Sequence, residues 1–277
     1  MTTWQGVIAP DPSLQKLEFV ELHKHLDIAL NSGNRANLSE FSGNSAEFDR
    51  YIRLNEKLPH GYEDQCSAKH YYDLMHAAIN SKAARIVDIG VFTGGSSTVL
   101  AAAALKHGAS LDLVDINDKY LLFTYERIRR VAPGAKVTLY RGDFPSYVKH
   151  VMTPNPSPSF IHHDGSHEFY QVVKDLASLY YVRQQVHSVL VQDTNLRGTN
   201  YRNFVDAAVA AVFGLDVKFE PLGMTAEATD PITIPNPYQG NYMLAGRPEA
   251  MLVHMAGATF LYPHSSMSID ELIAPHN

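Results

Sequence analysis

From residue 66 onward, short apolar runs alternate with longer segments whose apolar residues recur at helical spacing. Apolar runs of roughly four to eight residues are typical of buried strands, and the longer segments are typical of helices packed on a sheet. The predicted strands are 85–89, 111–115, 136–140, 160–163, 188–192, 216–222 and 241–245, and the predicted helices are 67–81, 96–107, 119–130, 144–152, 167–182 and 203–213. This alternation predicts an α/β fold: a doubly wound, Rossmann-like sheet of seven strands with helices on both faces.

The connection between the last two predicted strands, 223–240, contains three prolines and no helical pattern. Because a parallel crossover normally needs a helix, these two strands are expected to be antiparallel neighbours at the end of the sheet. Before the alternation begins, 14–30 and 47–58 have helical spacing and are separated by Gly/Asn/Ser turns. The expected organisation is a helical N-terminal cap (1–63), the sheet domain (64–247) and a C-terminal extension (248–277).

Composition narrows the functional classes. The 277 residues carry 23 basic and 29 acidic side chains, for a net charge of −6, and contain no Lys/Arg run, which argues against nucleic-acid binding. The longest apolar stretches, such as 99–105, are far shorter than the roughly 20 residues of a membrane span. With no evident leader and a single cysteine, Cys66, a reducing cytoplasm is the expected compartment.

A glycine-rich turn follows the first predicted strand and begins with an acid, in the order Asp88-Ile89-Gly90-Val91-Phe92-Thr93-Gly94. It lacks the GxGxxG spacing that seats a pyrophosphate in dinucleotide enzymes. Asp88 would repel a pyrophosphate but could hold an ammonium through water, and Asp115, which ends the second strand, suits two ribose hydroxyls. This pattern indicates a cationic nucleoside that bears an amino acid, namely S-adenosylmethionine. The alternative is a plain strand-to-helix turn.

The end of the third strand supplies residues for the adenine. Asp143 could accept a hydrogen bond from the adenine amine, and Phe144 could cover the ring. The alternative is that Asp143 is only a helix N-cap and Phe144 a core residue.

Two further strand ends suggest reaction chemistry. Asp164 follows the fourth strand and Asp193 the fifth, and two converging carboxylates favour a hard cation such as Mg²⁺ between them. His167, three residues after Asp164, can face the same point and act as a general base for a hydroxyl. Asp164 could instead be an N-cap, His162 and His163 are expected to pack or support rather than ligate, and a Zn²⁺ or Fe²⁺ site with these histidines stays open.

Taken together, these motifs resemble class I S-adenosylmethionine-dependent O-methyltransferases of the catechol and caffeoyl-CoA type, with relatives among macrocin O-methyltransferases and cephalosporin hydroxylases. The matching segments are Ser67-Ala68-Lys69, Asp88 to Gly94, Asp164-Gly165-Ser166-His167 with Tyr170, and Gln192-Asp193-Thr194-Asn195. The resemblance covers about residues 66–247. It departs where the family carries a second acid before Asp193 or an Asn after it, because Gln192 and Thr194 stand there, so a weaker metal site is expected.

The resemblance implies a base at His167 and metal ligands at Asp164, Asp193 and Gln192. The implied cofactor-binding residues are Ser67, Asp88, Gly90, Phe92, Thr93, Gly94, Ser96, Asp115, Ile116, Asp143, Phe144 and Asp164.

The expected function is methyl transfer to a hydroxyl of a small natural product with an aromatic or sugar ring. Three rivals stay open: a metal-free N-methyltransferase, a non-catalytic cofactor-binding partner of an oxidase, and an NAD-dependent oxidoreductase. The terminal extensions are expected to form the acceptor pocket or a contact with a second copy of the chain.

Overall fold

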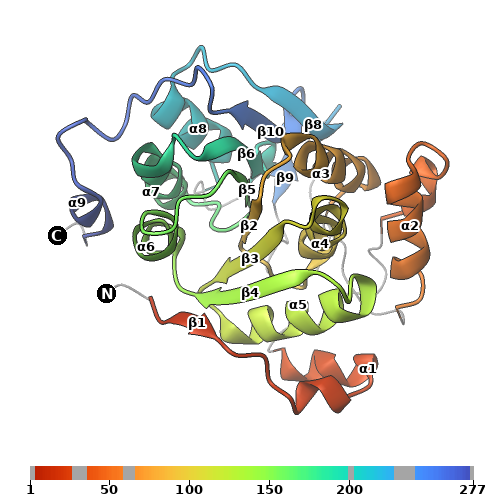
Figure 1. The fold of residues 1–277 in the computed structure, drawn as a ribbon. Coiled ribbons are helices and arrows are strands. Elements are labelled where there is room, and N and C mark those ends of the chain that lie inside the picture. Colours follow the sequence, from red (N-terminus) through yellow and green to blue (C-terminus); the bar gives the residue numbers. More distant parts are fainter. Residues whose placement is uncertain (1–3, 27–35, 59–65, 199–202, 228–240, 275–277) are drawn as a thin grey trace.

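A computed structural model describes residues 4–26, 36–58, 66–198, 203–227 and 241–274. An eight-stranded sheet runs through the molecule in the order β1-β4-β3-β2-β5-β6-β10-β8 (Figure 1). Its strands are β1 (Gly6–Ile8), β2 (Arg85–Ile89), β3 (Ser110–Asp115), β4 (Lys136–Arg141), β5 (Ser159–His163), β6 (Val186–Gln192), β8 (Glu220–Thr225) and β10 (Pro248–His254). The strands from β4 to β6 are parallel, whereas β1 and β10 run antiparallel to their neighbours. The predicted doubly wound α/β fold is therefore confirmed.

Helices cover both faces of the sheet (Figure 1). They are α1 (Phe19–Leu22), α2 (Ala46–Asn55), α3 (Ala68–Ser81), α4 (Gly95–His107), α5 (Asp118–Val131), α6 (Phe144–Tyr147), α7 (Phe169–Ser178), α8 (Val205–Phe213) and α9 (Ile269–Ile273). None of the helices in the described ranges is long and apolar enough to cross a membrane.

The sheet is buried on both sides, and each side has its own apolar core. On β2, Ile86 packs into the core formed with α2 to α5, whereas Val87 and Ile89 pack into the core formed with α6 to α9. Successive strand residues point to opposite faces, so a strand covered on both faces must be apolar at nearly every position. This explains why continuous apolar runs in the sequence predicted the positions of the central strands.

The N-terminal segment differs from the single helix expected over 14–30. It forms a 3₁₀ turn at Leu14–Lys16, then α1 and a second 3₁₀ turn at His23–His25, while 27–30 lie outside the described residues. Leu17 is extended, and its carbonyl oxygen accepts a hydrogen bond from the Arg130 guanidinium of α5 at 3.0 Å. That carbonyl is therefore used by α5 rather than by a continuous helix. The second expected helix is confirmed as α2.

The strand count also changes at this end. Three residues that were expected to belong to the helical cap form β1, which pairs antiparallel with β4 and makes the sheet eight-stranded rather than seven-stranded. A strand this short has too few residues to show an alternating pattern.

The expected strand over 241–245 is wrong in position. Only β9 (Tyr242–Met243) forms there, and it pairs with β7 (Leu196–Arg197) in a separate two-stranded sheet. The last strand of the main sheet is β10, whose buried run Ala250–Val253 suits a strand between two neighbours. The expected antiparallel pair at the end of the sheet is present, as β8 and β10, and the sheet runs past the expected boundary at residue 247.

Candidate functional site

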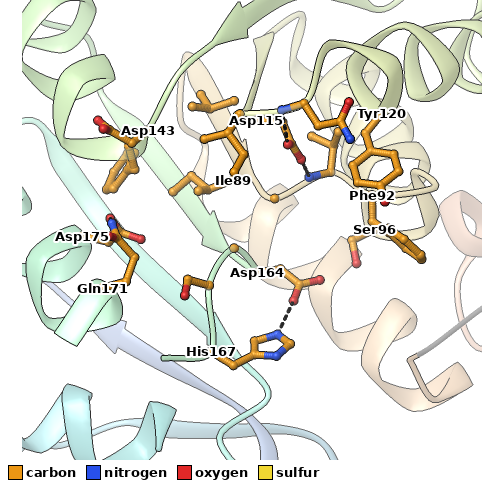
Figure 2. Close-up of a pocket in the computed structure, with 18 of the residues that line it drawn as sticks. Ile89, Phe92, Ser96, Asp115, Tyr120, Asp143, Asp164, His167, Gln171 and Asp175 are labelled. Atoms are coloured by element: carbon orange, nitrogen blue, oxygen red, sulfur yellow. Dashed lines mark hydrogen bonds and ion pairs between the residues drawn. The ribbon is translucent and has the colours of Figure 1, made fainter. Parts of the chain in front are cut away.

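A cavity of about 790 Å³ opens at the carboxyl ends of the parallel strands, where ligands of open α/β sheets bind (Figure 2). Most of the residues singled out from the sequence line it: Gly90, Phe92, Thr93, Gly94, Ser96, Asp115, Ile116, Asp143, Phe144, Asp164, His167 and Asp193. Ser67, Asp88 and Gln192 are not among the lining residues. The strand order thus brings motifs from five separate strand ends to one cavity.

The glycine turn after β2 lies directly against the segment that follows β5. Gly90 has φ +79°, and a Cβ atom there would lie 2.1 Å from the Asp164 carbonyl oxygen. Only glycine fits both the backbone angle and this close approach. The turn therefore fixes the spacing between the cofactor end and the reactive end of the cavity.

Asp115 ends β3 with its carboxylate at the cavity wall. One oxygen accepts from the Val91 amide at 3.0 Å and the other from the Asn117 amide at 2.8 Å (Figure 2). Burial raises the pKa of Asp115 to about 6 against these hydrogen bonds. A carboxylate held this rigidly, with remaining lone pairs at the cavity, is suited to accept from the hydroxyls of a sugar.

Asp143 and Phe144 combine the two roles that the sequence left open, a structural role at the start of α6 and a place in the cavity wall. The Asp143 carboxylate caps α6 by accepting from the Ser146 amide at 2.9 Å, and Phe144 is buried in the core, yet both also line the cavity. Ile116 directly follows the neighbouring strand β3 and also lines the cavity. It is 60% exposed. Phe144 and Ile116 thus give this end of the cavity an apolar surface, and Asp143 adds a hydrogen-bond acceptor beside it.

Asp88 is not where the sequence placed it. Its side chain is 1% exposed and lies beneath the turn, where it accepts from the Ser97 hydroxyl and lies 2.7 Å from Nδ1 of His162. It is thus a buried carboxylate compensated by neighbours rather than a group that faces an ammonium across the cavity.

Ser67 also has a structural role. Its hydroxyl caps α3 by accepting from the His70 amide at 3.0 Å, and it donates to the buried Glu249 carboxylate at 2.5 Å. Glu249 lies on β10, so this bond fastens the start of α3 to the sheet.

The reactive end combines two acids and one imidazole. Nε2 of His167 lies 3.9 Å from Asp164, the pair joined by a dashed line in Figure 2, and 2.8 Å from Asp193. Each of these three side chains is close to a quarter exposed. Burial opposes protonation, but the Asp193 and Asp164 carboxylates outweigh it and raise the pKa of His167 to about 10. Burial, with the adjacent Asp193 charge, raises the pKa of Asp164 to about 6.

The same three residues fit a divalent cation. One ligand atom from each of Asp164, His167 and Asp193 lies within 4.8 Å of the others. The two carboxylate oxygens suit Mg²⁺ or Mn²⁺, whereas the imidazole favours a transition metal such as Fe²⁺ or Zn²⁺, with remaining positions left to water and substrate. His167, which the sequence indicated only as a base, thus joins the candidate ligands.

Gln192 does not join this cluster, which corrects the expected ligand set. Its Oε1 lies 3.0 Å from Nε2 of His162, and its Nε2 donates to the Cys66 sulfur at 2.9 Å. The two histidines that end β5 are buried supports, as expected: His162 lies between Asp88 and Gln192, and His163 lies 2.9 Å from Asp175.

Sequence reasoning missed several lining residues. Cys66, Tyr71 and Tyr120 come from helix starts and faces, and Gln171, Lys174 and Asp175 come from α7. The last three are spaced i, i+3 and i+4, so helical periodicity after the Asp164 segment indicates that they share a face. Ile273, near the end of the chain, carries no comparable signal.

Comparisons with known proteins agree with this site. Residues 87–194 match the family model described as a methyltransferase domain, and this segment holds the glycine turn, Asp115, Asp164, His167 and Asp193. The match covers less than half of the 277 residues, so it shows a similarity of this segment to methyltransferase domains. A search of curated proteins finds no match.

Solved structures with a similar arrangement share few identical residues. The O-methyltransferase TomG of Streptomyces achromogenes is 18% identical over 56% of this chain and 69% of its own, with a TM-score of 0.40. The O-methyltransferase of Bacillus cereus is 14% identical over 78% and 94%, with a TM-score of 0.49. A methyltransferase of Podospora anserina is 12% identical over 68% and 73%, with a TM-score of 0.41. At such low identity the function must be argued from the site.

Proposed function

We propose that this protein transfers the methyl group of S-adenosylmethionine to an oxygen of a small molecule. The observation that carries the proposal is one continuous cavity with Asp115 near one end, the Asp164–His167–Asp193 cluster at the other, and the glycine turn between them. A carboxylate for ribose and a proton-accepting cluster at the reacting centre are the two groups that this reaction needs.

Each end of the cavity has a defined task in this proposal. Asp115 accepts from the ribose hydroxyls, while Asp143, Phe144 and Ile116 surround the base. The close contact of Gly90 with the Asp164 backbone holds the methyl donor and the acceptor in line, which is the main way a protein accelerates a displacement. Tyr71 and Phe92 add aromatic walls, which support an aromatic or sugar ring in a natural-product acceptor.

The cluster prepares the acceptor hydroxyl. When His167 is neutral, its imidazole accepts the hydroxyl proton, and the two carboxylates that contact Nε2 hold the ring in place. Because the same carboxylates raise the pKa of His167 to about 10, the neutral imidazole becomes abundant only as the pH rises toward that value. A divalent cation held by Asp164, Asp193 and His167 would take the place of this base: the imidazole would be a ligand, and the cation would lower the pKa of the acceptor hydroxyl.

A second candidate is metal-free transfer, including transfer to an amine. It is favoured by the 2.8 Å ion pair between His167 and Asp193, because a protonated imidazole already neutralises the charge that a cation would balance. An amine acceptor loses its proton without help from a metal. Turnover in excess chelator, compared with turnover after Mg²⁺ or Mn²⁺ is added back, separates the two: full activity in chelator supports this candidate and contradicts a metal role.

The cofactor assignment is tested by calorimetry with S-adenosylhomocysteine. Asp115→Asn should weaken binding by about 1.5–3 kcal/mol, the range for a hydrogen bond to a charged group. Asp118→Asn is the matched control, because Asp118 is exposed, pairs with Arg141 at 2.9 Å and does not line the cavity. Equal affinities for the wild type and Asp115→Asn would contradict the ribose assignment, and a wild type that binds no S-adenosylhomocysteine would contradict the proposed function.

A further inference from the structure

One wall of the cavity comes from outside the α/β unit. Ile273, the last residue of α9, lines the cavity and is 9% exposed. Lys174 on α7 lines the cavity beside it, and its ammonium group donates to the Ile273 carbonyl oxygen at 2.9 Å. The C-terminal segment therefore contributes an apolar side chain to the site, and a cavity-lining lysine holds it.

The position of α9 identifies the part of a ligand that it would meet. α9 packs on α6 and α7, and α6 begins at Phe144, just after β4. β4 is separated from β2 and β5, which carry the glycine turn and Asp164, by β3 with its Asp115. Since Asp115 takes the ribose in the proposed function, the group beyond it toward β4 and α6 is the nucleobase.

α9 is firmly attached rather than loosely laid on the surface. Ser268 and Glu271 form a reciprocal capping box at its start, and Asp270 pairs with Lys149. The Tyr181 hydroxyl donates to the Met267 carbonyl oxygen at 2.9 Å just before the helix. Leu272 is 1% exposed and belongs to the core on this face of the sheet. A wall fixed in this way can contribute binding energy without being ordered by the ligand.

We propose that α9 is part of the cofactor site and that Ile273 contacts the purine of the bound nucleoside. The inference rests on the proposed function, since it takes the cofactor to be S-adenosylmethionine. The recognised chemistry is the apolar surface of a purine base, which is shared by S-adenosylhomocysteine and free adenosine.

The test compares two truncations of similar size on adjacent residues of α9. Ile273→Ala should weaken S-adenosylhomocysteine about tenfold in calorimetry, because about two methylene equivalents of contact are lost at about 0.8 kcal/mol each. Binding of adenosine should weaken by a similar factor, because adenosine carries the same base. Leu272→Ala removes a core side chain that does not line the cavity, so it should lower the melting temperature. Both affinities should stay within about twofold of the wild-type values, a smaller change than the loss of one buried methylene would cause. Ile273→Val, a smaller loss, should fall between wild type and Ile273→Ala.

The outcomes distinguish this inference from the proposed function. If the wild type binds S-adenosylhomocysteine and Ile273→Ala binds it equally well, α9 is not part of the site although the proposed function stands. If Ile273→Ala weakens S-adenosylhomocysteine but not adenosine, the contact is not with the base and the inference fails. If Leu272→Ala weakens both ligands as strongly as Ile273→Ala, the effect comes from loss of α9 packing, and the specific contact of Ile273 is overturned.

Discussion

Asp193 adopts a left-handed backbone conformation, with φ +60°, at the point where β6 ends. Such angles are uncommon for residues other than glycine and cost energy that surrounding contacts must offset. The compensating contact is the 2.8 Å ion pair with His167. The backbone angle and the ion pair together direct the Asp193 carboxylate into the cavity.

The charge of this pair predicts a pH dependence of stability. With Asp193 and Asp164 outweighing burial, the pKa of folded His167 is about 10, above its ordinary value of 6.5. The pair's stabilisation is therefore fully present below pH 6.5 and is lost as pH rises through about 10. In urea unfolding with chelator present, the stability difference between wild type and His167→Gln should shrink across this interval.

The exposed His254–Glu220 pair, at 2.8 Å, is the control for this measurement. A surface pair contributes less than about 1 kcal/mol, so His254→Gln should differ little from wild type at any pH. A difference for His167→Gln that stays constant from pH 6.5 to 10 would mean that the folded protein does not hold His167 in its protonated form.

Single residues show which part of the site the sequence could predict. Asp115, Asp164 and Asp193 line the cavity, as expected from the sequence, because each directly ends or follows a strand of the parallel sheet. Asp88 and Gln192 do not line the cavity, and the alternation of side chains along each strand indicates why. Gln192 lies two residues after Leu190 and Asp88 two after Ile86, and both of these apolar side chains pack in the core with α3 and α4.

At the scale of elements, the turn after β2 is the most constrained connection at the site. Gly90→Ala should cost more than about 2 kcal/mol, because it adds left-handed strain of about 1–2 kcal/mol to an overlap with backbone that cannot rotate away. Since the overlapping atom belongs to Asp164, binding of S-adenosylhomocysteine should weaken as well.

Gly108 provides a matched comparison, because it has φ +68° at the end of α4 but no atom within 4 Å of an added Cβ. Gly108→Ala should therefore show the backbone strain alone, about 1–2 kcal/mol, with unchanged binding. Urea unfolding and calorimetry on both variants check the pair. Equal costs for the two substitutions would mean that the Gly90 turn can move away from Asp164.

The elements that sequence patterns predicted poorly share a physical cause. β1 and β9 consist of three and two residues, and their pairing depends on distant partners, β4 and β7, rather than on their own pattern. The chain near Leu17 likewise follows its contact with Arg130. Helices α3 and α5, by contrast, were predicted closely because their own periodicity determines which face is buried. Helix α4 is buried on nearly every side and was predicted from its Ala-rich composition.

At the scale of the whole molecule, the two ends of the described chain meet at one side of the sheet, near α6 (Figure 1). Trp4 stacks on His150 with ring centroids 5.4 Å apart, and Asp270 of α9 pairs with the preceding residue, Lys149. Both terminal segments thus pack around the same region of the α/β fold. No local pattern predicts this arrangement, because it joins residues more than a hundred positions apart.

The position of Trp4 has a practical consequence. A Cβ atom at Gly142 would lie 2.6 Å from the indole ring of Trp4, and Gly142 itself lines the cavity between β4 and Asp143. Trp4 is also the only tryptophan in the chain. Of the fluorescent side chains, which include 15 tyrosines, this single indole is the one that can be excited selectively at longer wavelength, and it lies directly behind the cavity wall at Gly142. Its emission therefore reports on that end of the cavity without any added label.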